Sequence, residues 1–155
     1  MRGAMTTTVR PGRPPQRPGP VHPSALSLVD QARRGLRDAA SLEAAADRYA
    51  AAHLAALRAA AAMLAARTQP SDPRLRRRRP TSAWVLLTAV VPELAEWAAF
   101  FAAGAGKRAA AEAGVVRAVT RREADDLVRD VGTFLAVVET TLGLLPRPEI
   151  RAVAG

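Results

Sequence analysis

The chain has 155 residues, no cysteine and a formal net charge of +9 at pH 7. Its length fits one domain with tails, and the lack of cysteine excludes disulfides and thiolate metal sites. Alanine and leucine dominate, β-branched and aromatic residues are sparse, and no segment alternates apolar with polar residues. This composition predicts an all-α protein.

The positive charge is concentrated in three segments. Residues 1–22 carry four arginines and no acid, residues 70–80 carry five arginines and one aspartate, and residues 144–155 carry two arginines and one glutamate. Residues 23–69 and 81–143 hold twelve basic and twelve acidic residues, so the predicted folded part is neutral. Basic appendages attract polyanions such as RNA without reading sequence. A GC-rich genome, which favours arginine and alanine, explains the same composition without a ligand.

The first 22 residues are rich in proline, arginine and glycine, and either Met1 or Met5 fits the start of the protein. Because they have too little apolar surface to repay the entropy of ordering, we expect a disordered tail. They contain no apolar run typical of a secretory signal. The most apolar later stretch, residues 83–106, is interrupted by Pro92 before about 18 apolar residues accumulate. We therefore expect a cytoplasmic protein without membrane contact.

Two helices are predicted in the first half of the chain. The first covers about residues 24–39, where four apolar residues fall at helical spacing: Leu26, Val29, Ala32 and Leu36. Ser41 is the expected N-cap of the second helix, and Glu43 would lie in its first turn, where the helix dipole favours a carboxylate. The second helix covers about residues 42–67 and ends before Pro70.

A linker over residues 70–80 precedes a long apolar segment. Thr81 or Ser82 caps a helix over about residues 82–91, and its continuation covers about residues 92–113. Pro92 is expected to kink this element or split it in two, because it removes a backbone donor and clashes with the preceding turn.

The last helix has the clearest start signal in the chain. Thr120 and Glu123 form a capping box, and Gly143 followed by Pro146 closes the helix. We expect an up-and-down bundle of four to five helices over residues 23–143, followed by a flexible tail over residues 144–155. Its core is expected to contain five aromatic residues: Trp84, Trp97, Phe100, Phe101 and Phe134.

Three segments, in this order, resemble the HEPN domain, the higher eukaryotes and prokaryotes nucleotide-binding domain. They are "RYAAAHLAALRAAAAML", "SAWVLL" and "VTRREADDLVRDVGTFLAVVE", and the resemblance covers about residues 24–142. Within that family the chain looks like a small high-GC, actinobacterial-type branch. The resemblance implies a bundle of four or five helices and usually a homodimer. It also implies an activity found in many members of the family, that of a metal-independent ribonuclease of the toxin type. In these members an arginine and a histidine separated by four to six residues cut RNA.

The resemblance singles out Arg48 and His53 as candidate catalytic residues. On a helix these two side chains point about 140° apart. His53 shares one face with Tyr49, Leu57 and Leu64, so we expect it to face the core or a partner helix, with Arg48 facing elsewhere. The chain also departs from the catalytic pattern. Tyr49 stands where a polar residue usually follows the arginine, and the pair lies in the second helix instead of a later one.

We favour a structural His53, hydrogen-bonded inside the bundle or at a subunit interface. The alternative is a catalytic His53, which would require a dimer in which the histidine meets its symmetry mate and Arg48 or the linker arginines bind the phosphate.

The linker holds the strongest electrostatic feature, a set of five arginines that are candidate nucleic-acid contacts: Arg74, Arg76, Arg77, Arg78 and Arg79. A solvated loop without a ligand explains them equally well. Four acidic residues look like ordinary solvated helix charges: Glu93, Glu96, Asp125 and Asp126. We expect no metal and no other cofactor, because the sequence has no E-x-x-H motif or similar ligand cluster.

Three functions remain open at this point. The preferred one is a non-catalytic HEPN-like bundle that acts through homodimerisation or another protein partner, with RNA contact by its basic segments. The second is a metal-independent endoribonuclease that uses Arg48 and His53 across a dimer. The third is a monomeric nucleic-acid-binding adaptor.

Overall fold

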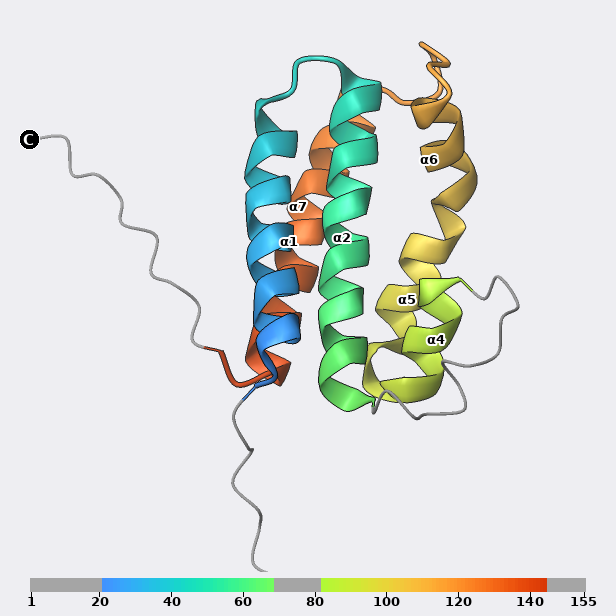
Figure 1. Ribbon diagram of the computed structural model, residues 1–155. Coiled ribbons are helices and arrows are strands. Elements are labelled where there is room, and N and C mark those ends of the chain that lie inside the picture. Colours follow the sequence, from blue (N-terminus) through green and yellow to red (C-terminus); the bar gives the residue numbers. More distant parts are fainter. Residues whose placement is uncertain (1–20, 69–81, 145–155) are drawn as a thin grey trace, which may run out of the picture.

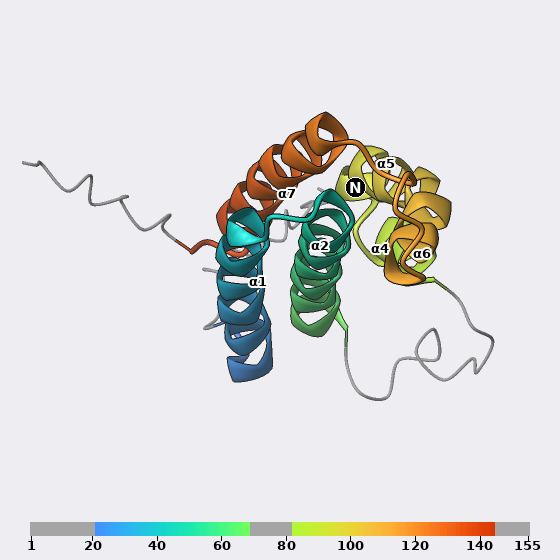
Figure 2. The ribbon, with the colours of Figure 1, turned by 90° about the horizontal axis from the view of Figure 1, so that it is seen from above.

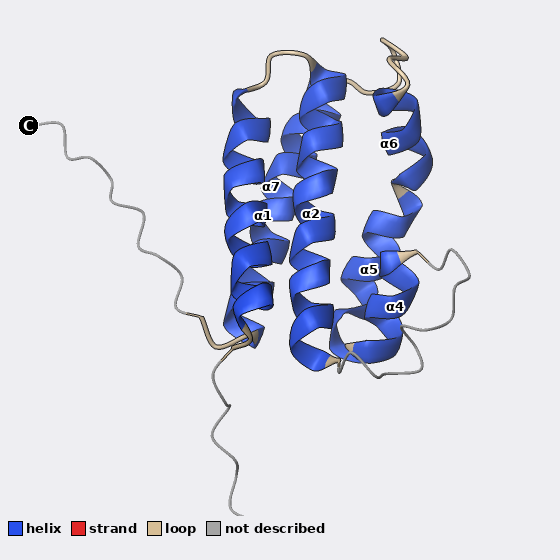
Figure 3. Cartoon of the chain, in the orientation of Figure 1, coloured by secondary structure: helices blue, strands red, loops and turns tan. Residues whose placement is uncertain are grey.

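The computed structural model describes residues 21–68 and 82–144, and these residues form an all-α bundle (Figures 1 and 3). They contain six α-helices, one short 3-10 helix and no strand, as the composition predicted. The elements are α1 (Pro23–Ser41), α2 (Ala45–Arg67), α4 (Ala83–Val90), η1 (Pro92–Leu94), α5 (Ala95–Ala103), α6 (Ala105–Glu112) and α7 (Arg121–Thr141). The linker arginines, residues 1–20 and residues 145–155 lie outside the described residues.

The connection between α1 and α2 differs from the sequence prediction. Ser41 is the last residue of α1, and its hydroxyl donates to the carbonyl of Asp38 at 2.7 Å. The second helix begins only at Ala45, after an N-cap alanine without a side-chain cap bond. The predictions of Ser41 as an N-cap and Glu43 in the first turn were therefore wrong, because the serine bonds backward to its own helix.

Helix α2 is the centre of the bundle. It packs against α1, α7, α6 and α4, and Figure 2 shows it between α1 and α7 on one side and α4 to α6 on the other. Most of its buried residues are alanines, whose small side chains allow close helix packing: Ala52, Ala55, Ala56, Ala59, Ala60 and Ala62. By length and composition α2 is apolar enough to cross a membrane, but half of that apolar window is buried inside the bundle.

The buried face of α2 also differs from the predicted one. Tyr49 and His53 are buried, as expected, but Leu57 and Leu64 are only partly buried. Met63 is the large apolar residue of α2 that is fully buried. The buried face of α2 therefore follows its alanines. The prediction had followed the larger apolar residues.

The segment around Pro92 is split, as predicted. Helix α4 begins after Ser82, whose hydroxyl accepts from the backbone N–H of Val85 at 3.3 Å, and it ends at Val90. Pro92 then opens η1, because it has no N–H to continue the preceding helix. The continuation over residues 92–113 is interrupted a second time at Gly104, which separates α5 from α6.

The predicted start of α7 and its end before Gly143 are confirmed, while Pro146 lies outside the described residues. The Thr120 hydroxyl accepts from the Glu123 N–H at 3.1 Å, and the Glu123 carboxylate accepts from the Thr120 N–H at 2.8 Å. After the helix, Gly143 has a φ of +74°, a left-handed conformation that glycine adopts without strain. The inner face of α7 buries six apolar residues: Ala124, Leu127, Val131, Phe134, Leu135 and Val138.

An aromatic cluster joins α4, α5 and α7. Trp84 stacks on Phe101 at 4.8 Å between ring centroids, and Phe101 lies 5.1 Å from Phe134 of α7. Trp97 is partly buried against the same rings. Phe100 is a correction to the predicted core, since 46% of it is exposed. Neighbouring helical residues point about 100° apart, and Phe100 is turned away from the side of α5 on which Phe101 is buried.

Candidate functional site

His53 lies in the middle of α2 and is only 1% exposed. Its Nε2 lies 3.3 Å from the carbonyl oxygen of Phe101 at the end of α5. Because a carbonyl only accepts, this contact requires the proton on Nε2 and leaves Nδ1 as the acceptor nitrogen. Within the described residues Nδ1 is buried without a hydrogen-bond partner. His53 is therefore a core residue that joins α2 to α5.

The surroundings of His53 favour its neutral form. Its ring meets the rings of Trp84 and Phe101 edge to face, at centroid distances of 5.8 and 6.0 Å. Burial lowers the pKa of His53, while the Phe101 carbonyl opposes this shift and the charge of Arg108 adds to it. At neutral pH the imidazole is uncharged and bonded to a backbone carbonyl, an arrangement that stabilises packing more than it serves proton transfer.

Arg48 is bound into the connection between α1 and α2. Its guanidinium donates to the carbonyl of Leu42 at 2.9 Å and to the carbonyl of Glu43 at 3.2 Å. It also forms an ion pair with Asp125 of α7 at 2.5 Å, and its side chain is only 12% exposed. The structure does not bring Arg48 and His53 together, since each has its own partners on a different side of α2.

A pocket of about 290 Å³ lies beside His53, and we call it the Tyr49 pocket. It opens where the chain breaks between α5 and α6, and α2 and α7 supply its other walls. A Cβ atom added at Gly104 would lie 2.9 Å from the hydroxyl oxygen of Tyr49, so a larger residue at this position would displace the hydroxyl. The pocket is lined by Tyr49, His53, Phe100, Phe101, Ala103, Gly104, Lys107 and Leu127.

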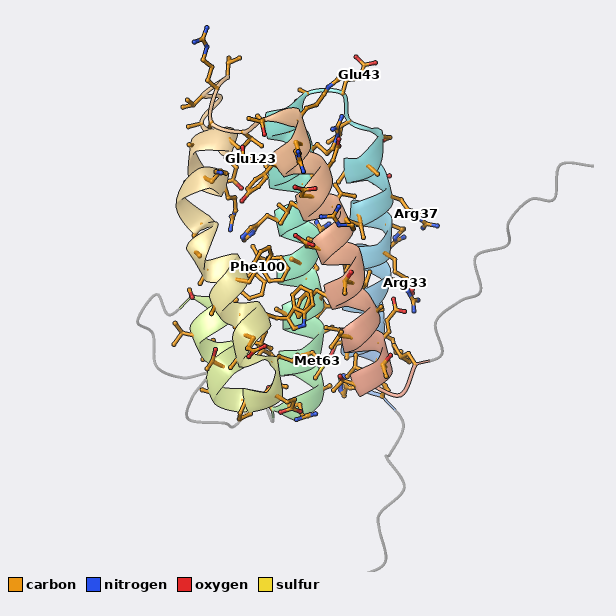
Figure 4. All side chains as sticks on the ribbon, turned by 180° about the vertical axis from the view of Figure 1, so that it is seen from behind. Arg33, Arg37, Glu43, Met63, Phe100 and Glu123 are labelled. Atoms are coloured by element: carbon orange, nitrogen blue, oxygen red, sulfur yellow. The ribbon has the colours of Figure 1, made fainter. Side chains whose placement is uncertain are left out.

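Lys107 is the charged residue of this pocket, and it forms an ion pair with Glu123 of the capping box. The hydrogen bond between them raises the pKa of Lys107 and lowers the pKa of Glu123. Burial raises the pKa of Tyr49, an effect that the nearby charge of Lys107 partly opposes. Figure 4 shows Glu123 at the start of α7, on the side that faces α6. At neutral pH the pocket thus carries one ammonium group and one protonated phenol.

A second polar arrangement joins α1 to α7, and sequence reasoning missed it. Arg33 donates from Nε to the buried carboxylate of Glu139 at 2.8 Å and forms an ion pair with Asp30 at 3.2 Å. The pair borders an open hollow of about 450 Å³ between the two helices. The one signal in the sequence is that Glu139 directly follows the apolar stripe of the last helix.

The remaining site predictions have mixed outcomes. In the described part of the chain, no group of three or more histidine, aspartate or glutamate side chains is placed to hold a metal ion. The predicted nucleic-acid contacts at Arg74 and Arg76–Arg79 lie outside the described residues. Three of the four supposed solvated acids have partners: Asp125 pairs with Arg48, Glu93 with Arg67 at 2.7 Å, and Asp126 with Arg129 at 3.1 Å.

Comparison with known proteins identifies one family. The family model described as SAV_6107-like HEPN matches residues 39–139, which include all of α2 and nearly all of α7. No curated protein and no solved structure matches the chain.

Proposed function

The chain belongs to the HEPN family, and from this membership we propose that it is a non-catalytic helical bundle that acts by pairing with a second copy of itself. The proposal that the bundle is non-catalytic rests on one observation: Arg48 and His53 bind different partners. A general acid or base must reach its substrate, and the histidine is enclosed by aromatic rings and bonded to a backbone carbonyl.

The arginine gives the same indication. In the ribonucleases that the sequence resembles, an arginine assists the histidine in cutting RNA. Arg48 instead uses its guanidinium on two backbone carbonyls and on Asp125. Freeing it for a phosphate would leave those carbonyls without their donor, so its bonds stabilise the fold at the expense of any role in cleavage.

The surface that we propose for pairing surrounds Phe100. This ring lies between α5 and α7 (Figure 4) and contacts Trp97 edge to face at a centroid distance of 6.2 Å. Next to it is a hollow of about 410 Å³ lined by Glu96, Trp97, Phe100 and Asp130. A projecting ring beside a hollow on the same face is suited to a two-fold interface, in which each copy fills the hollow of the other.

The basic segments give the protein a second means of contact. We propose that residues 1–22 and the linker arginines attract RNA or another polyanion by charge, since the rest of the chain is neutral overall. A cytoplasmic location is part of this proposal. The Phe100 surface could instead bind a different protein, and the following experiment distinguishes that case from self-pairing.

Sedimentation velocity of the full chain tests self-pairing directly. We expect the wild-type protein to sediment as a dimer and Phe100→Asp to sediment as a monomer with unchanged helicity. Val116→Asp is the matched control, because Val116 is 87% exposed on the connection between α6 and α7. A wild-type monomer at all concentrations would leave another protein as the partner of this surface and reject self-pairing.

One observation favours the ribonuclease alternative, namely that His53 forms part of the wall of the Tyr49 pocket. A toxin of this type would inhibit growth when it is expressed, and His53→Ala would relieve the inhibition. A wild-type protein that is harmless on expression contradicts this alternative.

A further inference from the structure

We propose that the Tyr49 pocket binds a small aromatic carboxylate. This inference goes beyond the proposed self-pairing, because the ligand would occupy a pocket within one subunit, although Phe100 borders both this pocket and the pairing surface. The pocket combines an aromatic interior with hydrogen-bond donors at one side, and this combination defines the ligand class.

The interior of the pocket is suited to a flat apolar group. Its lining includes Phe100, which is 46% exposed, the aliphatic side chain of Leu127, and Phe101 and His53, which are each only 1% exposed. Aromatic rings pack favourably against one another edge to face or offset-stacked, beyond the gain from buried area. His53 adds no charge to this interior, because its imidazole is neutral and bonded to Phe101.

The polar side of the pocket is suited to an anion. Lys107 is the one charged residue that lines the pocket within the described chain. Its ammonium group has three donors, so it can bind a ligand carboxylate while it keeps its bond to Glu123. The Tyr49 hydroxyl is a further donor, because burial raises its pKa and keeps the proton in place at neutral pH.

The size of the pocket limits the ligand. A volume of about 290 Å³ is near the lower end for ligand pockets and fits a molecule of about ten heavy atoms. Gly104 is part of this limit, because any side chain at this position would displace the Tyr49 hydroxyl. Phenylacetate has the required size and charge, and phenylacetamide is its uncharged counterpart.

Titration of the full chain with both compounds, followed by amide NMR, tests the proposal. The Gly104 amide reports on the pocket, and the amides of Gly35 and Gly132 report on α1 and α7 away from it. We expect phenylacetate to shift the Gly104 signal to saturation and phenylacetamide to bind at least about tenfold more weakly, the loss typical of one charge-assisted hydrogen bond. Equal binding of the two compounds, or no saturable shift up to about 10 mM phenylacetate, overturns the proposal.

Two variants, one of Lys107 and one of Arg108, test which residue contacts the ligand carboxylate. Lys107→Gln is expected to weaken phenylacetate binding about tenfold and to leave phenylacetamide binding unchanged. Arg108→Gln is the matched control, since Arg108 adjoins Lys107 in sequence but pairs with Glu112 and does not line the pocket. Unchanged phenylacetate binding by a folded Lys107→Gln variant contradicts the proposal. Sedimentation of the same variant reads out self-pairing separately.

Discussion

Arg48 of α2 and Asp125 of α7 are 77 residues apart in the sequence and form an ion pair at 2.5 Å. The same arginine donates to two carbonyls of the connection between α1 and α2. One side chain therefore fixes three parts of the bundle. An arginine that the family resemblance marks as catalytic thus connects α2 with α7 and with the segment that precedes α2.

Removal of this arginine is expected to lower stability. Arg48→Ala removes two hydrogen bonds to backbone carbonyls, each worth about 0.5 to 1.5 kcal/mol net, so we expect the free energy of unfolding to fall by about 1 to 2 kcal/mol. Asp125→Asn should cost less, because Asp125 is largely exposed and its ion pair is screened by water. Urea denaturation followed by circular dichroism measures both, with the exposed Arg117→Ala as control. An Arg48→Ala variant as stable as Arg117→Ala would contradict this role.

Gly104 and Gly106 should respond in opposite directions to alanine. At Gly104 the new Cβ would lie 2.9 Å from the Tyr49 hydroxyl, so Gly104→Ala is expected to destabilise the protein by about 1 to 2 kcal/mol. At Gly106 a Cβ meets nothing within 4 Å, so Gly106→Ala should stabilise α6 by about 0.5 to 1 kcal/mol.

A double-mutant cycle assigns the Gly104 effect to the hydroxyl. Tyr49→Phe removes the clashing atom, so the double variant should recover most of the stability lost in Gly104→Ala. Thermal unfolding of the four proteins gives the coupling energy. Strictly additive effects would show that the clash arises elsewhere.

His53 should make stability depend on pH below neutrality. Its pKa is lower in the folded protein than in the unfolded chain, so the unfolded state binds more protons as the pH falls below about 6.5. The stability that this histidine supplies is thus complete above that pH and decreases toward its folded pKa. The slope reaches at most about 1.4 kcal/mol per pH unit.

Urea denaturation between pH 7.5 and pH 5 measures this slope. His53→Gln should flatten it, because glutamine does not titrate. His22→Asn is the control, since His22 is on the surface and asparagine also caps a helix. A His53→Gln variant with the wild-type slope would show that other groups produce the pH dependence.

The ion pair of Arg33 and Glu139 predicts that removing the arginine costs more stability than neutralising the glutamate. Arg33→Ala leaves a buried carboxylate without its cation, and we expect it to cost about 1 to 3 kcal/mol. Glu139→Gln keeps an acceptor oxygen for Arg33 and should cost less. Equilibrium unfolding in urea compares them, and the reverse order would show that the ion pair does not control this contact.

Local signals were sufficient to predict most of the fold. The capping box at Thr120, the break at Pro92 and the left-handed Gly143 each act within a few residues, so the sequence displays them directly. Ser41 misled the prediction because its hydroxyl has two local uses, and only the structure shows which one it takes. Phe100 was placed in the core because it belongs to a run of apolar residues at helical spacing, but its ring lies on the partly exposed side of α5.

The candidate site was less accessible to sequence reasoning. The spacing of Arg48 and His53 is local, but their partners, Asp125 and Phe101, are 77 and 48 residues away. The Tyr49 pocket likewise depends on how α2 meets the break between α5 and α6 at Gly104. Contacts between distant segments depend on helix packing, which periodicity in one segment does not define.

Cleavage of RNA by the purified protein in the presence of a chelator tests the central claim most directly. With the wild-type protein in excess over a labelled RNA, we expect no more cleavage than with a variant that carries both His53→Ala and Arg48→Ala. Metal-independent cleavage by the wild-type protein that disappears in each folded single variant would contradict a non-catalytic bundle.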